Sequence, residues 1–380
     1  MHRTVSRFLL LSALCAASAT CSTGASTEGP NAADASVDGG DAVGADATGG
    51  GPGASSDAGS SAPARIGYAL GASAASSPAE LDALMAHYET LGVDALWAVA
   101  AMESLCSTAT CDFTPLDRVI ARARARGWPV DLQVHGTPNW ISSAGLWHGP
   151  ATDTEVRQWT ELFHQLVAHY GTDIAYYELW NEPDDAAFWA PSPSPRDYAR
   201  LLHSVYLDAK AVNPAVQIVA PNTGRAALGY LDAMYDALAA YPDAAARHFF
   251  FDVLGMHPYA GDGGGGFDPS DAPGSHDITT PLGVSGWAFL DYRRMHDQVI
   301  KREGRAKDLV FGEFGYSTSS GAWFSVPEAT RARYVASAYR LARQDGYIRS
   351  LAIYAHGTGD GFEIHGTATE TSIATVAKEP

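Results

Sequence analysis

The chain has 380 residues and a formal net charge of −18 at pH 7, from 43 acidic and 25 basic residues. A strongly acidic surface repels phosphate groups, so this balance argues against nucleic acid and anionic membranes as partners. It identifies neither a substrate nor an oligomeric state.

The first 21 residues have the pattern of a secretory signal. Met1 to Arg7 is basic, and Phe8 to Ala19 is a short apolar run that ends in small residues. Such a run is too short for a membrane span and predicts a cleaved leader at residues 1–21. Two outcomes stay open: cleavage after Ala19 gives a secreted protein, whereas lipid attachment to Cys21 gives a surface-anchored one.

Residues 22–63 consist mainly of Ala, Gly, Ser, Thr and Asp, with no Lys, Arg or aromatic residue. A segment of this kind cannot bury enough apolar surface to offset the entropy lost on ordering, so we expect a disordered tether. Residues 64–380 then form one domain of the size of an α/β barrel.

The domain alternates short apolar runs with helical patterns. Many of the predicted helices begin with Ser or Thr, then Pro, then an acidic residue, as in Ser77-Pro78-Ala79-Glu80. The expected strands are Ile66 to Leu70, Leu96 to Ala101, Val130 to Val134, Ile174 to Trp180, Val216 to Ala220, Val253 to Met256, Leu309 to Gly312 and Leu351 to Tyr354.

Repeated strand–helix units predict an α/β fold with a parallel sheet, and eight of them predict a closed (β/α)8 TIM barrel. An open doubly wound sheet is the alternative. The barrel is favoured because chemically active residues follow the third, fourth, sixth and seventh strands, and only a barrel brings those ends to one face. After Asp360-Gly361 no clear helix pattern follows, so we expect the last helix to be short or absent.

Two glutamates stand at the ends of buried strands. Glu182 lies in Asn181-Glu182-Pro183, where the proline ends the strand and leaves the carboxylate at the rim. The strand before it is expected to be apolar on both faces. Glu313 follows Leu309 to Gly312. A lone rim glutamate can serve in a surface salt bridge, but two are the equipment of a glycoside hydrolase.

Three segments carry a resemblance to a known group of enzymes. Ile174 to Asp184, His257-Pro258-Tyr259 and Phe311 to Thr318 together resemble the motifs of the clan of (β/α)8 retaining glycoside hydrolases. Family 39 and the cellulase-like family 5 are the most similar. The resemblance covers most of the region from Ile66 to Tyr354.

The resemblance implies a role for each matching residue. Glu182 matches the acid/base and Glu313 the nucleophile. Asn181 matches the residue that binds the sugar 2-hydroxyl, Tyr259 the tyrosine that orients the nucleophile, and His257 a substrate-contacting histidine. The chain departs from the clan in lacking an arginine after its first two strands and a tryptophan after its eighth.

Rim aromatic residues are further candidates, since sugars stack on aromatic rings. Trp140 is the leading candidate for a substrate platform, and Trp323 is another. His135, at the end of the third strand, is a further candidate for binding substrate. For the two tryptophans, simple packing of a loop is the alternative, and for His135 it is a hydrogen-bonded rim histidine that does not bind substrate.

Cys106 and Cys111 are close in a loop and are expected to form a disulfide in an exported protein. A metal site is the weaker alternative, because no histidine flanks them. No cofactor or metal motif is recognisable in the sequence.

The leading hypothesis is an exported retaining hydrolase that cleaves O-glycosidic bonds, which we expect to be β bonds, in a polysaccharide or oligosaccharide. A surface carbohydrate-binding protein on an inactive barrel is one alternative. A transglycosylase that uses the same glutamates is another.

Overall fold

The computed structural model describes residues 65–70, 77–355 and 360–379. The predicted leader, the tether and Cys21 lie outside this part of the chain.

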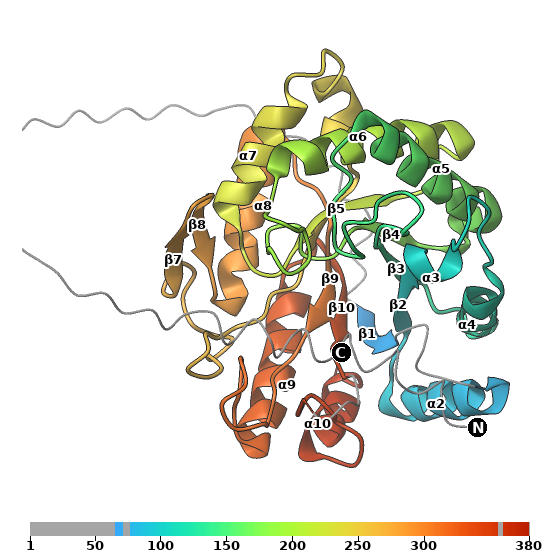
Figure 1. Ribbon diagram of the computed structural model, residues 1–380. Coiled ribbons are helices and arrows are strands. Elements are labelled where there is room, and N and C mark those ends of the chain that lie inside the picture. Colours follow the sequence, from blue (N-terminus) through green and yellow to red (C-terminus); the bar gives the residue numbers. More distant parts are fainter. Residues whose placement is uncertain (1–64, 71–76, 356–359, 380) are drawn as a thin grey trace, which may run out of the picture.

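Eight parallel strands close into a barrel, in the order β1, β2, β3, β4, β5, β6, β9, β10 (Figure 1). The barrel closes because β1 pairs with both β2 and β10. The prediction of an α/β (β/α)8 barrel is therefore confirmed. The barrel strands are β1 (Arg65–Leu70), β2 (Ala95–Ala101), β3 (Val130–His135), β4 (Tyr176–Leu179), β5 (Ile218–Thr223), β6 (Val253–Met256), β9 (Leu309–Phe314) and β10 (Ile348–Ile353).

Helices surround the barrel and bury their apolar faces against it (Figure 1). Their starts follow the local sequence: Ser77 accepts a hydrogen bond from the backbone N–H of Glu80, and Thr152 and Glu155 form a capping box. The helices are α2 (Pro78–Leu91), α3 (Met102–Leu105), α4 (Thr114–Ala125), α5 (Asp153–Tyr170), α6 (Pro195–Val212), α7 (Leu228–Leu238), α8 (Tyr292–Glu303), α9 (Glu328–Gln344) and α10 (Ala368–Val376).

Two elements were not expected in detail. The segment between β6 and α8 contains a small antiparallel hairpin, β7 (Asp277–Thr280) and β8 (Gly283–Gly286). The last helix, α10, is present and short; Thr367 caps it by accepting from the backbone N–H of Glu370. Within the described residues, no helix is long and apolar enough to cross a membrane.

The barrel interior is more polar than the sequence suggested. The expectation that β4 is apolar on both faces is wrong, because Glu178 is fully buried on this strand. Asp131 and Gln133 on β3 and His257 after β6 are buried as well. The reason is that alternate residues of a barrel strand face the interior, where polar side chains are stable if they contact one another.

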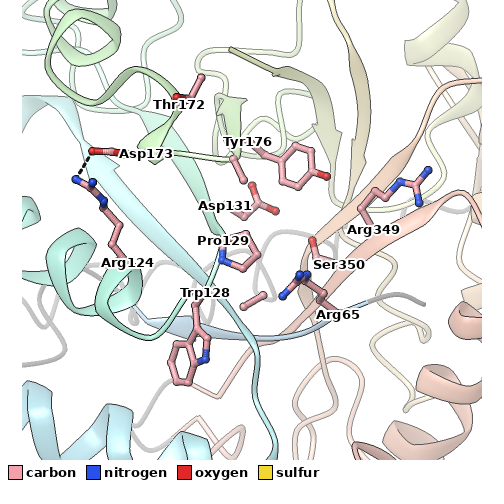
Figure 2. A pocket seen from close by; sticks show the side chains of 13 residues that line it. Arg65, Arg124, Trp128, Pro129, Asp131, Thr172, Asp173, Tyr176, Arg349 and Ser350 are labelled. Atoms are coloured by element: carbon pink, nitrogen blue, oxygen red, sulfur yellow. Dashed lines mark hydrogen bonds and ion pairs between the residues drawn. The ribbon is translucent and has the colours of Figure 1, made fainter. Parts of the chain in front are cut away.

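A pocket of about 510 Å³ lies at the end of the barrel where the strands begin (Figure 2). Asp131 lines it, together with Arg124 and Arg349. Both arginines are already paired, with Asp173 and Asp308 respectively. Barrel enzymes carry their chemistry at the opposite end, so this pocket is not the candidate active site.

Candidate active site

Glu313 reaches the mouth of the barrel through an irregularity in β9. Leu351 pairs with Phe311 and Ile353 with Phe314, so β9 has one extra residue between these pairs. Phe311 and Phe314 both contact Phe289 in the outer layer. A bulge of this kind turns the intervening side chain inward, which is how the Glu313 carboxyl comes to face the interior.

Glu182 lies in the loop that follows β4. Its backbone N–H donates to the carbonyl of Asn222 at 3.0 Å, which ties this loop to the end of β5. Its own φ is 39°, in the left-handed region. Beside it, a Cβ on Gly224 would stand 2.7–3.0 Å from the Glu182 carboxyl group. The site thus accepts local backbone strain and needs a glycine at position 224 to place this carboxyl.

The two carboxyl groups come together around His257. Nδ1 of His257 is 2.9 Å from Oε1 of Glu182 and 3.9 Å from Oε2 of Glu313. One oxygen of each glutamate and the histidine nitrogen all lie within 4.8 Å of one another. The glutamate side chains are about 15% and 14% exposed, so solvent reaches both. His257 itself is fully buried and contacts Glu182 from below.

The nearby carboxyl groups determine the ionisation state of His257, and His257 in turn affects that of Glu313. Burial opposes a charged His257, but the nearby Glu313 and Glu182 outweigh it and raise the histidine pKa to about 9. Burial raises the pKa of Glu313, while the charge of His257 and the hydrogen bond from Tyr259 lower it in part. The hydroxyl of Tyr259 donates to Oε2 of Glu313 at 2.9 Å. His257 is therefore a cation near neutral pH.

These three groups also have the spacing of a metal site. A protonated imidazole has no free lone pair to offer a metal. Because the pKa of His257 is raised to about 9, a metal ion would have to displace the proton of this histidine to bind here.

Asn181 is held by a hydrogen-bonded chain that begins on β3. Nε2 of Gln133 donates to Oδ1 of Asn181 at 2.7 Å, and Gln133 also bonds to Glu313. Oε1 of Gln133 is 2.9 Å from Nδ1 of His135. His135 is buried, which lowers its pKa to about 3, and its ring packs on Trp147. His135 is thus a neutral neighbour that orients Gln133.

Several of these residues were not foreseen. Asp184 accepts from the backbone N–H of Gly224 at 3.0 Å and forms an ion pair with Arg225 at 3.5 Å. Burial raises the pKa of Asp184 to about 6, with Arg225 opposing. Polar residues at the end of β5 were the available signal, since every strand end of a barrel opens on the same face.

The rim aromatic residues divide into exposed and buried ones. Trp140 and Trp323 are 36% and 37% exposed, as a sugar platform requires. Trp140 donates to the carbonyl of Cys106 at 2.9 Å. Trp323 lies near Trp287, with 5.6 Å between ring centroids. By contrast, Trp189 is buried in the core.

Cys106 and Cys111 form a disulfide, with an S–S distance of 2.05 Å, so this prediction is confirmed. Both thiols are consumed by the bond, which removes them as metal ligands. The disulfide closes the loop that carries the carbonyl acceptor of Trp140. It therefore supports the rim of the candidate site.

A second carboxyl pair lies deeper in the barrel. Asp131 and Glu178 are neighbours, and burial raises the pKa of Asp131 to about 7 and that of Glu178 well above its ordinary value. Trp97 donates to Oε2 of Glu178 at 3.2 Å. A Cβ on Gly312 would stand 2.6–2.8 Å from the same carboxyl group, so only glycine fits there. The two carboxyls can hydrogen-bond each other only if one keeps its proton.

No protein-family model and no curated protein sequence matches this chain. Solved structures do. A family 39 glycoside hydrolase from Bacteroides cellulosilyticus WH2 aligns with a TM-score of 0.62 and 16% identity over 83% of this chain and 64% of that one. A monomeric beta-xylosidase from Caulobacter crescentus CB15 aligns with a TM-score of 0.58 and 18% identity, over 83% of this chain and 69% of that one.

A mutant of xylanase A from P fluorescens subsp. cellulosa, in complex with xylopentaose, gives a TM-score of 0.54 and 12% identity over 84% of this chain and 99% of that one. This chain thus spans 64% and 69% of the two longer neighbours. At these identities the likeness shows the fold. It is the fold of the clan that the motifs resemble.

Proposed function

We propose that this protein is a retaining glycoside hydrolase, with Glu313 as nucleophile and Glu182 as acid/base. The observation that carries the proposal is the spacing of the two glutamates, whose nearest oxygens lie within 4.8 Å. Retaining enzymes hold their carboxyl groups about 5–5.5 Å apart, whereas inverting enzymes leave about 6.5–9.5 Å for a water molecule.

The neighbours of each glutamate suit its proposed role. Tyr259 donates to Glu313 and so fixes the oxygen that attacks the anomeric carbon. Nδ1 of His257 lies 2.9 Å from Oε1 of Glu182, so a proton on this nitrogen can pass to the carboxylate before it is given to the leaving oxygen. Once Glu313 carries the sugar, its negative charge is lost, and Glu182 acts as the base that activates water.

Gln133 links Asn181 to the nucleophile, because it bonds both Asn181 and Glu313. This contact supports a role for the Asn181 amide as the donor to a sugar 2-hydroxyl. Trp140 and Trp323 offer exposed rings for stacking. Glucose and xylose units are the first candidates, since the solved neighbours include a glucosidase, beta-xylosidases and a xylanase bound to xylopentaose.

The experiment is trapping of the covalent intermediate. The purified protein is incubated with 2-fluoro glycosides of glucose, xylose, mannose and galactose, then analysed by intact mass and peptide mapping. We expect one adduct, on Glu313, with the sugar at the cleaved bond. Glu313→Gln is the matched control and should remain unlabelled.

Two other functions predict different outcomes. A carbohydrate-binding barrel would give no adduct and no release of sugar from a polysaccharide panel, while still retaining ligand. A transglycosylase would give the same adduct but transfer the sugar to an added acceptor. The first outcome would overturn the proposal, and the second would change only the acceptor.

Export remains part of the proposal. The leader and the tether support it, and mass spectrometry of the native N-terminus tests it. A lipid-modified chain starting at Cys21 indicates an anchored enzyme, and an unmodified start near that residue indicates a secreted one. A chain that retains Met1 would refute export.

A further inference from the structure

Three potential metal ligands meet far from the carboxyl pair. His87 lies on α2, His365 lies just before α10, and Glu370 lies in the first turn of α10. Nε2 of His87 is 2.6 Å from Oε1 of Glu370. Nδ1 of His365 is 3.2 Å from Nε2 of His87 and 3.3 Å from Oε1 of Glu370. The three atoms thus form a small triangle.

The triangle has nearly the size that zinc requires. Zinc binds imidazole nitrogen and carboxylate oxygen at about 2.0–2.2 Å in tetrahedral geometry, which places ligand atoms roughly 3.3 Å apart. The two distances to His365 match this value. The third, from His87 to Glu370, is a hydrogen-bond distance and must open by roughly 0.7 Å when an ion replaces the shared proton.

The Glu370 carboxylate is already oriented to bind a zinc ion. Its second oxygen, Oε2 of Glu370, accepts from the backbone N–H of Gly366 at 2.8 Å, which leaves Oε1 directed at the histidines. Glu370 is only 13% exposed, whereas the His365 side chain is 82% exposed. The cluster is therefore fixed on its inner side and open to incoming ions on its outer side.

We propose that His87, His365 and Glu370 form a zinc site that links the first and last helices of the barrel. Two imidazoles, one carboxylate and a water molecule are an established donor set for zinc. Calcium and magnesium prefer oxygen ligands and suit this site poorly. The proposal is independent of the enzyme's activity.

The position of the proposed site indicates a role in stabilising the fold. α2 and α10 pack together, and a Cβ on Gly92 at the end of α2 would contact Ala377 just after α10. His87 is 278 residues from His365 and 283 residues from Glu370 in sequence. An ion that joins them would hold the two ends of the barrel domain in register and stabilise the folded state by binding it selectively.

In the described part of the chain, no other surface histidine belongs to a three-ligand cluster. Among the described residues, His164 pairs with Asp208 at 3.1 Å, and neither belongs to a three-ligand cluster. This pair is exposed, helical and similar in chemistry. It therefore offers a matched control for the zinc site.

The test uses the full chain, purified without a histidine tag and stripped of metal with a chelator. Zinc is titrated by calorimetry and against a coloured chelator, and Tm is measured with and without zinc. We expect one zinc ion per chain and a rise in Tm of about 5 °C at a hundredfold excess over Kd. Calcium should neither bind to the chain nor raise its Tm.

The variants locate the ion. His365→Ala and His87→Ala should lose both the binding and the rise in Tm, while His164→Ala keeps both. We expect the His365→Ala variant to fold, because the His365 side chain is largely exposed. No zinc binding, or zinc binding that survives His365→Ala, would overturn the proposal. Binding that is lost only in Glu313→Gln would place the ion in the carboxyl pair and would overturn it as well.

Discussion

Replacing Asp131 with asparagine should make the protein more stable at neutral pH and change it little in acid. In the folded protein, burial raises the pKa of Asp131 from 3.8 to about 7, so the carboxyl keeps its proton where the unfolded chain has lost it. A raised pKa stabilises the folded state fully below pH 3.8, and this contribution is lost as pH rises towards 7.

The magnitude follows from the shift. Each unit corresponds to about 1.36 kcal/mol, so a rise from 3.8 to about 7 costs the wild type on the order of 4 kcal/mol above pH 7. Asparagine has the shape of the protonated acid and does not titrate. The free energy of unfolding of Asp131→Asn should therefore exceed that of the wild type by an amount that grows across pH 4 to 8.

Urea unfolding followed by tryptophan fluorescence, at one-unit steps between pH 4 and 8, measures this difference. Glu178→Gln should behave in the same way, since Glu178 is the other half of the pair. Asp82→Asn is the control: Asp82 is exposed and Arg122 lowers its pKa, so its contribution is lost as pH falls. A constant gap between wild type and Asp131→Asn across the pH range would refute a buried protonated carboxyl.

Three further predictions concern the candidate active site. Gly224→Ala should lower kcat at least tenfold with little change in Tm, because the new Cβ meets the Glu182 carboxyl at 2.7–3.0 Å; an unchanged kcat would show that Glu182 can move aside. His257→Asn should shift the acid limb of the kcat/KM profile to higher pH, because the cation that lowers the pKa of Glu313 is lost; an unmoved limb would contradict this. Cys106→Ser should raise KM more than it lowers kcat, because the loop that holds Trp140 loosens; equal KM values would argue against Trp140 as a platform.

The sequence predicted the barrel well because its signals are local. Apolar runs, Ser-Pro helix starts and strand-end glutamates each occupy a few neighbouring residues, and the expected strands agree with the structure to within a few residues. The sequence left open whether the last helix is short or absent, although Thr367 and Glu370 form a recognisable helix start. The apolar pattern after Thr367 is too weak to predict a helix from the capping residues alone.

What the sequence could not show are contacts between distant strands. Nothing near Gly312 indicates that Glu178 fills the space beside it, and nothing near Gly224 indicates that it borders Glu182. The bulge that turns Glu313 inward depends on the pairing of β9 with β10. These features arise from register and closure of the barrel, which local patterns do not encode.

The interior carboxyl pair and the candidate active site are electrostatically joined. Glu178 is one of the anions that raise the pKa of His257, and His257 in turn lowers the pKa of both Glu178 and Glu313. Because Asp131 and Glu178 can share a proton, the field at His257 depends on whether that proton is present. When Glu178 is ionised, its charge thus helps to hold His257 as a cation beside Glu182, which is the state in which it can supply a proton.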